Sequence, residues 1–195
     1  MSTNEIKAVK EEAVVEKKSA GFGYYAKIGL TLLVISAVTA SLLALVNAVT
    51  KDKIAENERA VMEDALNSIF GGCDEIEAVE GEYGGSIIAV YSVYSDGKLL
   101  GYGIQAAPTG FKDAIGLIVG TTVDGQCLGV NITSISDTPG VGTKVKESSF
   151  LERFKGLNND SVDSIDTISG ATISSKAVKQ GVAEVLALDI YGSLE

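Results

Sequence analysis

The side chains best suited to chemistry gather near the C-terminus, in the stretch Asp166-Thr-Ile-Ser-Gly-Ala-Thr172. Ser174 and Ser175 follow it, where the spacing of apolar residues predicts the start of the last helix, about Ile173–Leu188. A helix N-terminus exposes unpaired N–H groups and a partial positive charge, so it suits a phosphate. The hydroxyl of Thr172 is able to form a phosphoester there, and the hydroxyls of Ser174 and Ser175 would hold phosphate oxygens.

The residues before Thr172 fit the same interpretation. Gly170 and Ala171 are small enough to let the backbone approach a bulky ligand, and Ser169 adds a further donor. Asp166 would engage a modifying enzyme or fix the loop through its backbone N–H groups. The alternative is an ordinary helix cap, because Ser and Thr favour that position and stabilise a helix by about 1 kcal/mol.

A second candidate segment is the loop Asp137-Thr-Pro-Gly-Val-Gly-Thr143. Thr138, Pro139, Gly140 and Gly142 are its candidate binding residues, since the glycines would let backbone groups face a flat ligand. The alternative is a connecting turn, for which Pro and Gly are common.

The composition excludes several kinds of chemistry. There is no histidine, so Ser-His-Asp and Cys-His nucleophile pairs and His-held metals or haem are ruled out. Cys73 and Cys127 are too few for an iron–sulfur cluster within the chain, and we predict no metal site. They are expected to be buried apolar residues. The alternative is a disulfide between them, which requires that the domain lie outside the cytoplasm. Residues 51–195 hold 11 Lys+Arg against 22 Asp+Glu, a net charge of −11 that disfavours nucleic acid.

An uncharged apolar run covers residues 28–49. Its 22 residues would rise about 33 Å as a helix, enough to cross a membrane. Lysines lie on both sides of the run, so local charge hardly sets its orientation. We therefore predict an N-terminal arm over residues 1–27, a transmembrane helix over 28–49 and a folded domain over 50–195. The alternative is a buried helix of a soluble protein.

The domain should be an α+β fold in which helices pack on a small antiparallel sheet. Helical spacing from Ile54 to Phe70 ends at Gly71-Gly72. Two hairpins are expected next, one joining strands 87–94 and 98–105 and the other joining 114–123 and 126–134. A helix is predicted over 148–154 before the last helix.

These motifs, in this order, resemble the G subunit of the Rnf family of ion-pumping redox complexes, over most of residues 20–195. The resemblance is carried by the Ser-Gly-Ala-Thr segment ending at Thr172 and by Asp-Thr-Pro-Gly-Val-Gly from Asp137, where the family has Glu-Thr-Pro-Gly-Leu-Gly. The C subunit of the Na⁺-pumping quinone reductase is similar but usually longer. Many relatives carry a His before the acid of the loop, where this chain has Ser136.

The resemblance implies a covalent FMN, linked through its phosphate to Thr172 by a flavin transferase, with Ser169, Gly170 and Ala171 as the frame of the attachment. It implies a single-pass protein of the cell (inner) membrane, with its FMN-binding domain extracytoplasmic. Its partners would be the other Rnf subunits, and it would be an electron-transfer subunit of an ion-translocating oxidoreductase that does not catalyse the net reaction alone. The competing interpretation is a membrane-tethered extracytoplasmic binding or assembly module without a redox cofactor.

Overall fold

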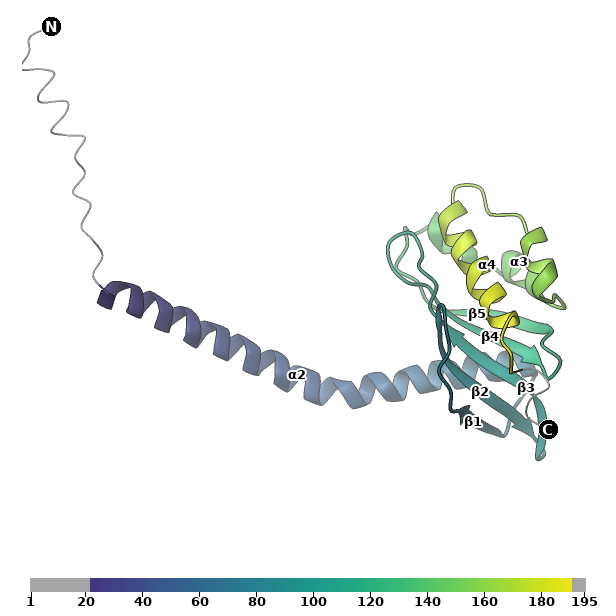
Figure 1. Ribbon diagram of the computed structural model, residues 1–195, viewed down its shortest axis with the longest axis horizontal. Coiled ribbons are helices and arrows are strands. Elements are labelled where there is room, and N and C mark those ends of the chain that lie inside the picture. The colour runs from purple at the N-terminus through teal and green to yellow at the C-terminus, as the bar shows by residue number, and fades with distance from the viewer. Residues whose placement is uncertain (1–21, 191–195) are drawn as a thin grey trace, which may run out of the picture. The chain divides into compact units, whose positions relative to one another are not determined.

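The computed structural model describes residues 22–190, and the chain divides into two compact units, 1–55 and 56–195. The first helix, α2 (Phe22–Phe70), runs through the boundary between them (Figure 1). Residues 1–21 of the predicted arm lie outside the described residues, whereas residues 22–27 are already helical. The helix predicted from Ile54 is therefore a continuation of the apolar helix.

The apolar part of α2 has the length and composition of a membrane-spanning helix. Every side chain from residue 22 to residue 50 is exposed, which argues against the alternative of a buried soluble helix. Four of its hydroxyl groups are satisfied within the helix, since each donates to the carbonyl four residues earlier: those of Thr31, Thr39, Ser41 and Thr50. Such internal bonding suits a helix in hydrocarbon, where water is absent.

The predicted end of α2 at Gly71-Gly72 is confirmed. The N–H groups of Gly71 and Gly72 both donate to the carbonyl of Asn67, at 3.0 and 3.1 Å. Gly71 has a φ of 79°, which glycine adopts without strain. The two bonds stop the helix and turn the chain towards the sheet.

A five-stranded antiparallel sheet follows, in the order β1-β2-β3-β4-β5. The strands are β1 (Glu75–Val79), β2 (Ile87–Ser95), β3 (Lys98–Ala106), β4 (Gly116–Thr122) and β5 (Cys127–Ser134). Both predicted hairpins are present, as β2–β3 and β4–β5. Strand β1 was not predicted, because its Glu-Ile-Glu-Ala-Val sequence carries charges that strands usually avoid.

The remaining elements lie in the second half of the chain. They are η1 (Gly142–Lys146), α3 (Ser148–Leu151), η2 (Glu152–Phe154), η3 (Asn159–Ser164) and α4 (Thr172–Leu186). The helix predicted over 148–154 is thus one α-helical turn continued by a 3₁₀ turn. The last helix begins one residue earlier and ends two residues earlier than predicted.

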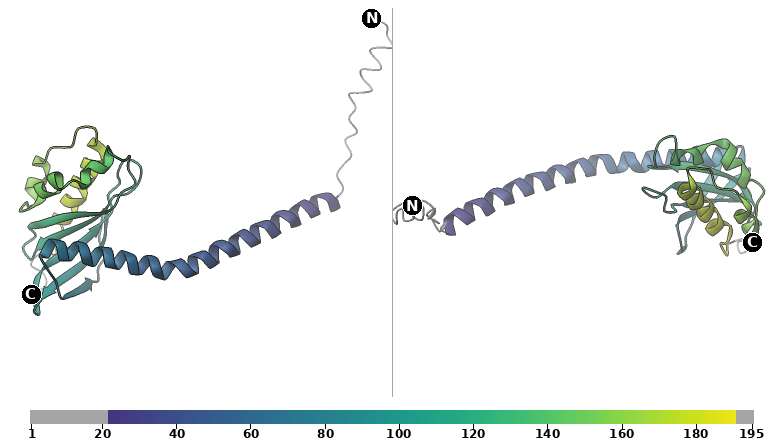
Figure 2. Two further views of the ribbon diagram at one scale, coloured as in Figure 1. Left: turned by 180° about the vertical axis from the view of Figure 1, so that it is seen from behind. Right: turned by 90° about the horizontal axis from the view of Figure 1, so that it is seen from above.

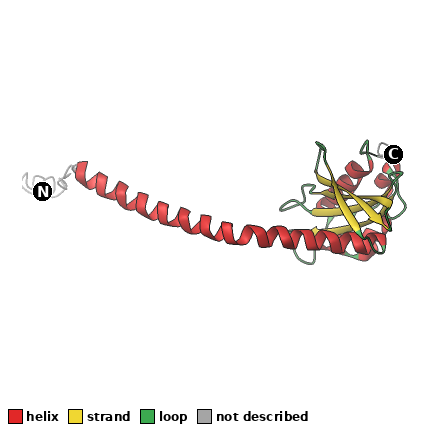
Figure 3. Cartoon of the chain, turned by 90° about the horizontal axis from the view of Figure 1, so that it is seen from below, coloured by secondary structure: helices red, strands yellow, loops and turns green. Residues whose placement is uncertain are grey.

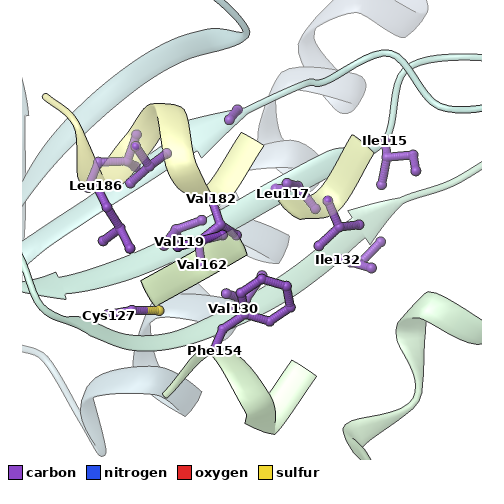
Figure 4. Close-up of a cluster of buried hydrophobic side chains, with 14 of the residues drawn as sticks. Ile115, Leu117, Val119, Cys127, Val130, Ile132, Phe154, Val162, Val182 and Leu186 are labelled. Atoms are coloured by element: carbon purple, nitrogen blue, oxygen red, sulfur yellow. The ribbon is translucent and has the colours of Figure 1, made fainter. Parts of the chain in front are cut away.

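Helices cover both faces of the sheet, so the predicted α+β class is confirmed (Figures 2 and 3). On one face, α4 and the α3–η2 segment bury a large apolar cluster, part of which Figure 4 shows around Val119, Val182 and Phe154. On the other face, Ala65 and Leu66 near the end of α2 pack against Val93 and Ile118.

Two glycines explain how the end of α2 lies so close to the sheet. A Cβ atom at Gly103 would overlap the side chain of Leu66, and one at Gly120 would come within 2.5 Å of Ile69. At these two positions the missing side chain therefore lets a helix pack directly on the sheet.

The two cysteines are free thiols. Cys127 is buried, and burial raises the pKa of its thiol to about 12. Cys73 is half-buried and its thiol donates to Asn67 at 3.2 Å. The expectation of two buried apolar residues is therefore right for Cys127 and only partly right for Cys73.

Candidate functional site

The site is built at the start of α4. The N-cap residue is Ala171, and no side chain caps the helix. The first helical bond is donated by the N–H of Ser175 to the carbonyl of Ala171, at 2.8 Å. The side chain of Thr172 is exposed at this end. The alternative interpretation of the motif as a Ser or Thr cap is therefore wrong.

The loop before Thr172 is held by Ser175. Its hydroxyl donates to the carbonyl of Ala171 at 2.8 Å and accepts from the N–H of Ile168 at 3.1 Å. Ser175 is fully buried, so its hydroxyl fixes the turn. Gly170 has a φ of 81°, a conformation that favours glycine.

A hollow of about 400 Å³ opens beside this helix start, within the range of about 300–1,000 Å³ typical of small-molecule sites. Six of the predicted binding residues line it: Thr138, Gly142, Gly170, Ala171, Thr172 and Ser174. The two motifs, separated by about thirty residues in the sequence, therefore meet at one place. Its wall is mainly apolar, and the buried Asp137 is among the residues that line it.

Asp137 joins the three segments around the hollow. Its carboxylate accepts from the hydroxyl of Ser174 at 2.6 Å and from the N–H groups of Lys112 and Phe111 at 2.8 and 3.4 Å. Burial by itself would raise the pKa of Asp137, but these hydrogen bonds together hold it below its usual value. The start of α4 adds a favourable partial positive charge. The carboxylate is thus ionised and fully engaged at neutral pH.

Gly142 allows the loop to close on this carboxylate. A Cβ atom there would lie 2.6 Å from Cβ of Asp137 and 3.0 Å from the hydroxyl of Ser174. The loop is also tied internally, because the N–H of Gly140 donates to the hydroxyl of Thr143 at 2.8 Å. The glycine predicted to face a ligand is therefore needed for packing as well.

Sequence reasoning missed the apolar side chains of the site. Phe111, Val141 and Ile173 line the hollow and are 65, 44 and 51 % exposed. Nothing in the sequence marked these three residues as part of a site, because an isolated exposed apolar residue is ordinary at a protein surface. Such exposure becomes informative only when three such residues meet around one hollow.

Other predicted residues lie away from the hollow. Asp166, Ser169, Pro139 and Gly140 are exposed or half-exposed but do not line it. Within residues 22–190 the carboxylate of Asp166 forms no hydrogen bond to its own loop, which disfavours the loop-fixing role. The strand tyrosines Tyr91, Tyr94 and Tyr102 do not line it either, and Tyr102 is buried in the core.

Comparisons with known proteins agree with the two motifs. The family described as "FMN-binding domain" matches residues 110–187, and the family described as "RnfG N-terminal region" matches residues 25–69. The first match spans the whole wall of the hollow. The second covers most of α2.

Relatives align over most of the chain. It is 31 % identical over 192 residues to the G subunit of the Na⁺-translocating ferredoxin:NAD⁺ oxidoreductase complex of Acetobacterium woodii, covering 86 % of this chain and 92 % of the relative. It is 30 % identical over 183 residues to the G subunit of the ion-translocating oxidoreductase complex of Escherichia coli K12, covering 80 and 86 %.

A solved structure shares the fold. The C subunit of the Na⁺-translocating NADH-quinone reductase from Parabacteroides distasonis superposes with a TM-score of 0.50 at 16 % identity, covering 72 % of this chain and 97 % of that one. The arrangement of sheet and helices is therefore one already known from a solved protein.

Proposed function

This chain belongs to the family of the G subunits of ion-translocating oxidoreductase (Rnf) complexes, and we propose that it carries electrons in such a complex on FMN esterified to Thr172. The proposed attachment rests on the position and exposure of the Thr172 side chain. Its side chain is exposed at the first position of α4, beside the hollow, and does not cap the helix.

The residues around the hollow fit the phosphate and the ring of FMN. The start of α4 offers N–H groups that precede the first helical bond, which suits a phosphate linked to Thr172. The apolar side chains of Phe111, Val141 and Ile173 supply a surface for a flat aromatic ring. FMN supplies the one- and two-electron chemistry, which the histidine-free chain lacks. The chain binds it, excludes water from part of it and keeps it beside one fixed helix end.

Ser174 contributes differently from the sequence-based expectation. Its single proton is donated to Asp137, so the hydroxyl positions the loops rather than donating to phosphate. Ser175 is engaged in the same way with Ala171. Phosphate oxygens are therefore assigned to backbone N–H groups of the helix start.

Attachment needs an outside enzyme. Forming the ester would join Thr172 Oγ1 to phosphorus and break a phosphoanhydride bond of an activated flavin donor. The other phosphate half of that donor would depart as the leaving group, and the hydroxyl proton would pass to a base. The chain has no histidine, and Asp137 is already bonded to three donors. We therefore assign the base to a flavin transferase, and we assign the exposed Asp166 to engaging that enzyme.

The apolar part of α2 anchors the chain in the cell membrane, with the N-terminal arm inside and the acidic domain outside. The single candidate span within residues 22–190 carries no charge over residues 28–49, so ion passage belongs to partner subunits. The relative from Acetobacterium woodii is part of a ferredoxin:NAD⁺ oxidoreductase, and we assign this chain to the same class of complex.

Thr172→Ala tests the attachment. After co-expression with a flavin transferase, we expect the native chain to keep its yellow colour on denaturation and to exceed its bare mass by one FMN. Thr172→Ala should show the bare mass, and Thr172→Ser should regain flavin because it restores a hydroxyl.

Thr109→Ala is the matched control, since Thr109 is exposed and lies outside both motifs. It should load flavin normally. FMN on a peptide that lacks Thr172 would refute the assignment. A colourless native chain with the bare mass would support the binding or assembly module instead.

Orientation is tested by Lys98→Cys, which places a thiol at the exposed start of β3, next to the β2–β3 turn. The variant should be made on a Cys73→Ser background, because Cys73 is half-exposed whereas Cys127 is buried. A membrane-impermeant maleimide should label intact cells. Labelling only after lysis would place the domain inside.

A further inference from the structure

The two edges of the sheet differ in how they are protected. Strand β1 forms one edge and carries Glu75 and Glu77, with Asp74 just before it. Charges on an edge strand discourage another chain from pairing with it. Strand β5 forms the opposite edge, and its eight residues carry no charge (Figure 1). An edge of this kind is a template for a further strand.

Among residues 22–190, only the first residue of that edge forms backbone hydrogen bonds to a segment other than β4. The N–H of Cys127 donates to the carbonyl of Leu157 at 2.9 Å, and the N–H of Gly156 donates to the carbonyl of Cys127 at 2.7 Å. Within residues 22–190, the backbone of residues 128–134 bonds to no other segment's backbone except that of β4. Alternate residues of an edge strand point their N–H and C=O groups outward.

A groove of about 320 Å³ runs along this edge. Five consecutive residues of β5, from Leu128 to Ile132, line it. Successive side chains of a strand point to opposite faces of the sheet. A hollow on one face would therefore contact every second residue, whereas a groove along the edge of the strand contacts five consecutive residues. Ser68 and Ile69 of α2 form one wall, and residues of the 146–155 segment form the other. The walls stand on opposite faces of the sheet, which leaves room for an extended chain between them.

The groove differs in charge from the rest of the domain. Lys146 and Lys155 both line it, with Glu152 as its one acidic residue. Residues 51–195 as a whole carry a net charge of −11. A positive groove on an acidic domain attracts a negatively charged segment and repels other positive ones.

We propose that the β5 groove binds an extended, acidic segment of another subunit, which adds to the sheet as a sixth strand. Main-chain hydrogen bonds to β5 supply the affinity, and acidic side chains facing Lys146 and Lys155 set the register. A second copy of the chain fits less well. Two β5 edges would bring the same lysines together, and a β5–β1 contact would leave further edges open and form a filament.

Hydrogen exchange of the backbone amides tests the added strand. The full chain alone in detergent should be compared with the chain in its assembled complex. We expect residues 128–134 to exchange at least about tenfold more slowly in the complex, because new main-chain bonds must open first. Residues 75–79 of β1 serve as the internal control and should not change. Equal exchange of β5 in the two states would overturn the proposal.

Charge reversal and cross-linking identify the occupant. Lys146→Glu and Lys155→Glu should each lower the fraction of the chain retained in the purified complex more than Lys98→Glu, which changes an exposed lysine at the start of β3. Equal losses would refute the charge argument. A photo-cross-linker at Asn131 should join an acidic segment of a different subunit. An adduct with a second copy, or with a segment lacking acidic residues, would overturn the assignment.

The exchange measurement should be repeated with Thr172→Ala. Strand addition does not involve the flavin, so a colourless complex should protect β5 as the native one does. Absence of protection in native and variant complexes alike refutes the docking site alone. Absence of colour from the native chain refutes the flavin assignment alone.

Discussion

Two carboxylates, Asp137 and Glu184, attach loops to opposite ends of α4. Asp137 binds Ser174 in the first turn, whereas Glu184 lies in the last turns and accepts from the N–H and the hydroxyl of Ser86, at 2.7 and 2.6 Å. Each is approached by a glycine. A Cβ atom at Gly85 would lie 2.6 Å from Oε2 of Glu184, as one at Gly142 would lie 2.6 Å from Cβ of Asp137.

The two carboxylates differ in whether they lie at the hollow. Asp137 is buried at the wall of the hollow, whereas Glu184 is half-buried and lines no part of it. The helix dipole favours a carboxylate at the start of α4 and disfavours one near its end. The same kind of attachment thus shapes the wall of the hollow at one end of the helix and holds a loop at the other.

The largest effect is expected from Asp137→Asn. The amide group would direct N–H donors at the backbone donors of Phe111 and Lys112 or leave one of the existing bonds unmade. We expect a loss of about 2–3 kcal/mol in the free energy of unfolding, because a charged acceptor is replaced in a buried network. Chemical denaturation of the flavin-free chain in detergent would measure it.

The same variant should also bear less flavin after co-expression with the transferase, because the loops around the hollow lose their common tie. Asp137→Glu is the conservative control and should retain part of both properties. If Asp137→Asn were as stable as the native chain, Asp137 would not be the residue that joins the three segments.

A smaller effect is expected from Glu184→Gln. An amide keeps one acceptor for Ser86, and the site is half-exposed, so the free energy of unfolding should fall by about 1 kcal/mol. Flavin loading should equal that of the native chain. A loss of flavin as large as that of Asp137→Asn would show that the two ends of α4 are not separate in function.

This contrast also shows what could be predicted from the sequence of the site. Thr172 and its small neighbours were singled out by their resemblance to a family motif, and a helix start with Gly, Ala and hydroxyl residues also suits phosphate. The role of Asp137 was not predicted, because its partners Lys112 and Ser174 lie 25 and 37 residues away in the sequence. Phe111 and Ile173 were missed for the same reason, since only the fold brings them to one hollow.

The fold was predictable where the pattern was local. Turn residues and alternating apolar residues defined β2–β3 and β4–β5, and an uncharged run defined the apolar part of α2. Strand β1 escaped because its pairing with β2, from Glu75 opposite Tyr94 to Val79 opposite Val90, overrides a weak local preference. The bounds of the helices were less certain, since their ends depend on tertiary contacts.

The smallest expected effect is the response of the two carboxylates to acid. Burial alone would raise the pKa of Asp137, but the hydrogen bonds to its carboxylate outweigh burial and lower that pKa. The pKa of Glu184 is also lowered, mainly by the hydrogen bond from the Ser86 hydroxyl. A group with a lowered pKa in the folded state stabilises the protein fully above its unfolded pKa, about 3.9 for Asp and 4.3 for Glu. That stability is lost as the pH falls through the folded pKa.

Titration of these two groups should therefore leave the free energy of unfolding unchanged between pH 7 and about 5.5 and should lower it below about pH 4.5. Asp137→Asn and Glu184→Gln should each flatten this acid limb, Asp137→Asn more, because the exposed part of Glu184 is screened by water. Denaturant titrations at a series of pH values would measure both slopes. An acid limb identical in the native chain and in Asp137→Asn would mean that the carboxylate at the hollow titrates as it does in the unfolded chain.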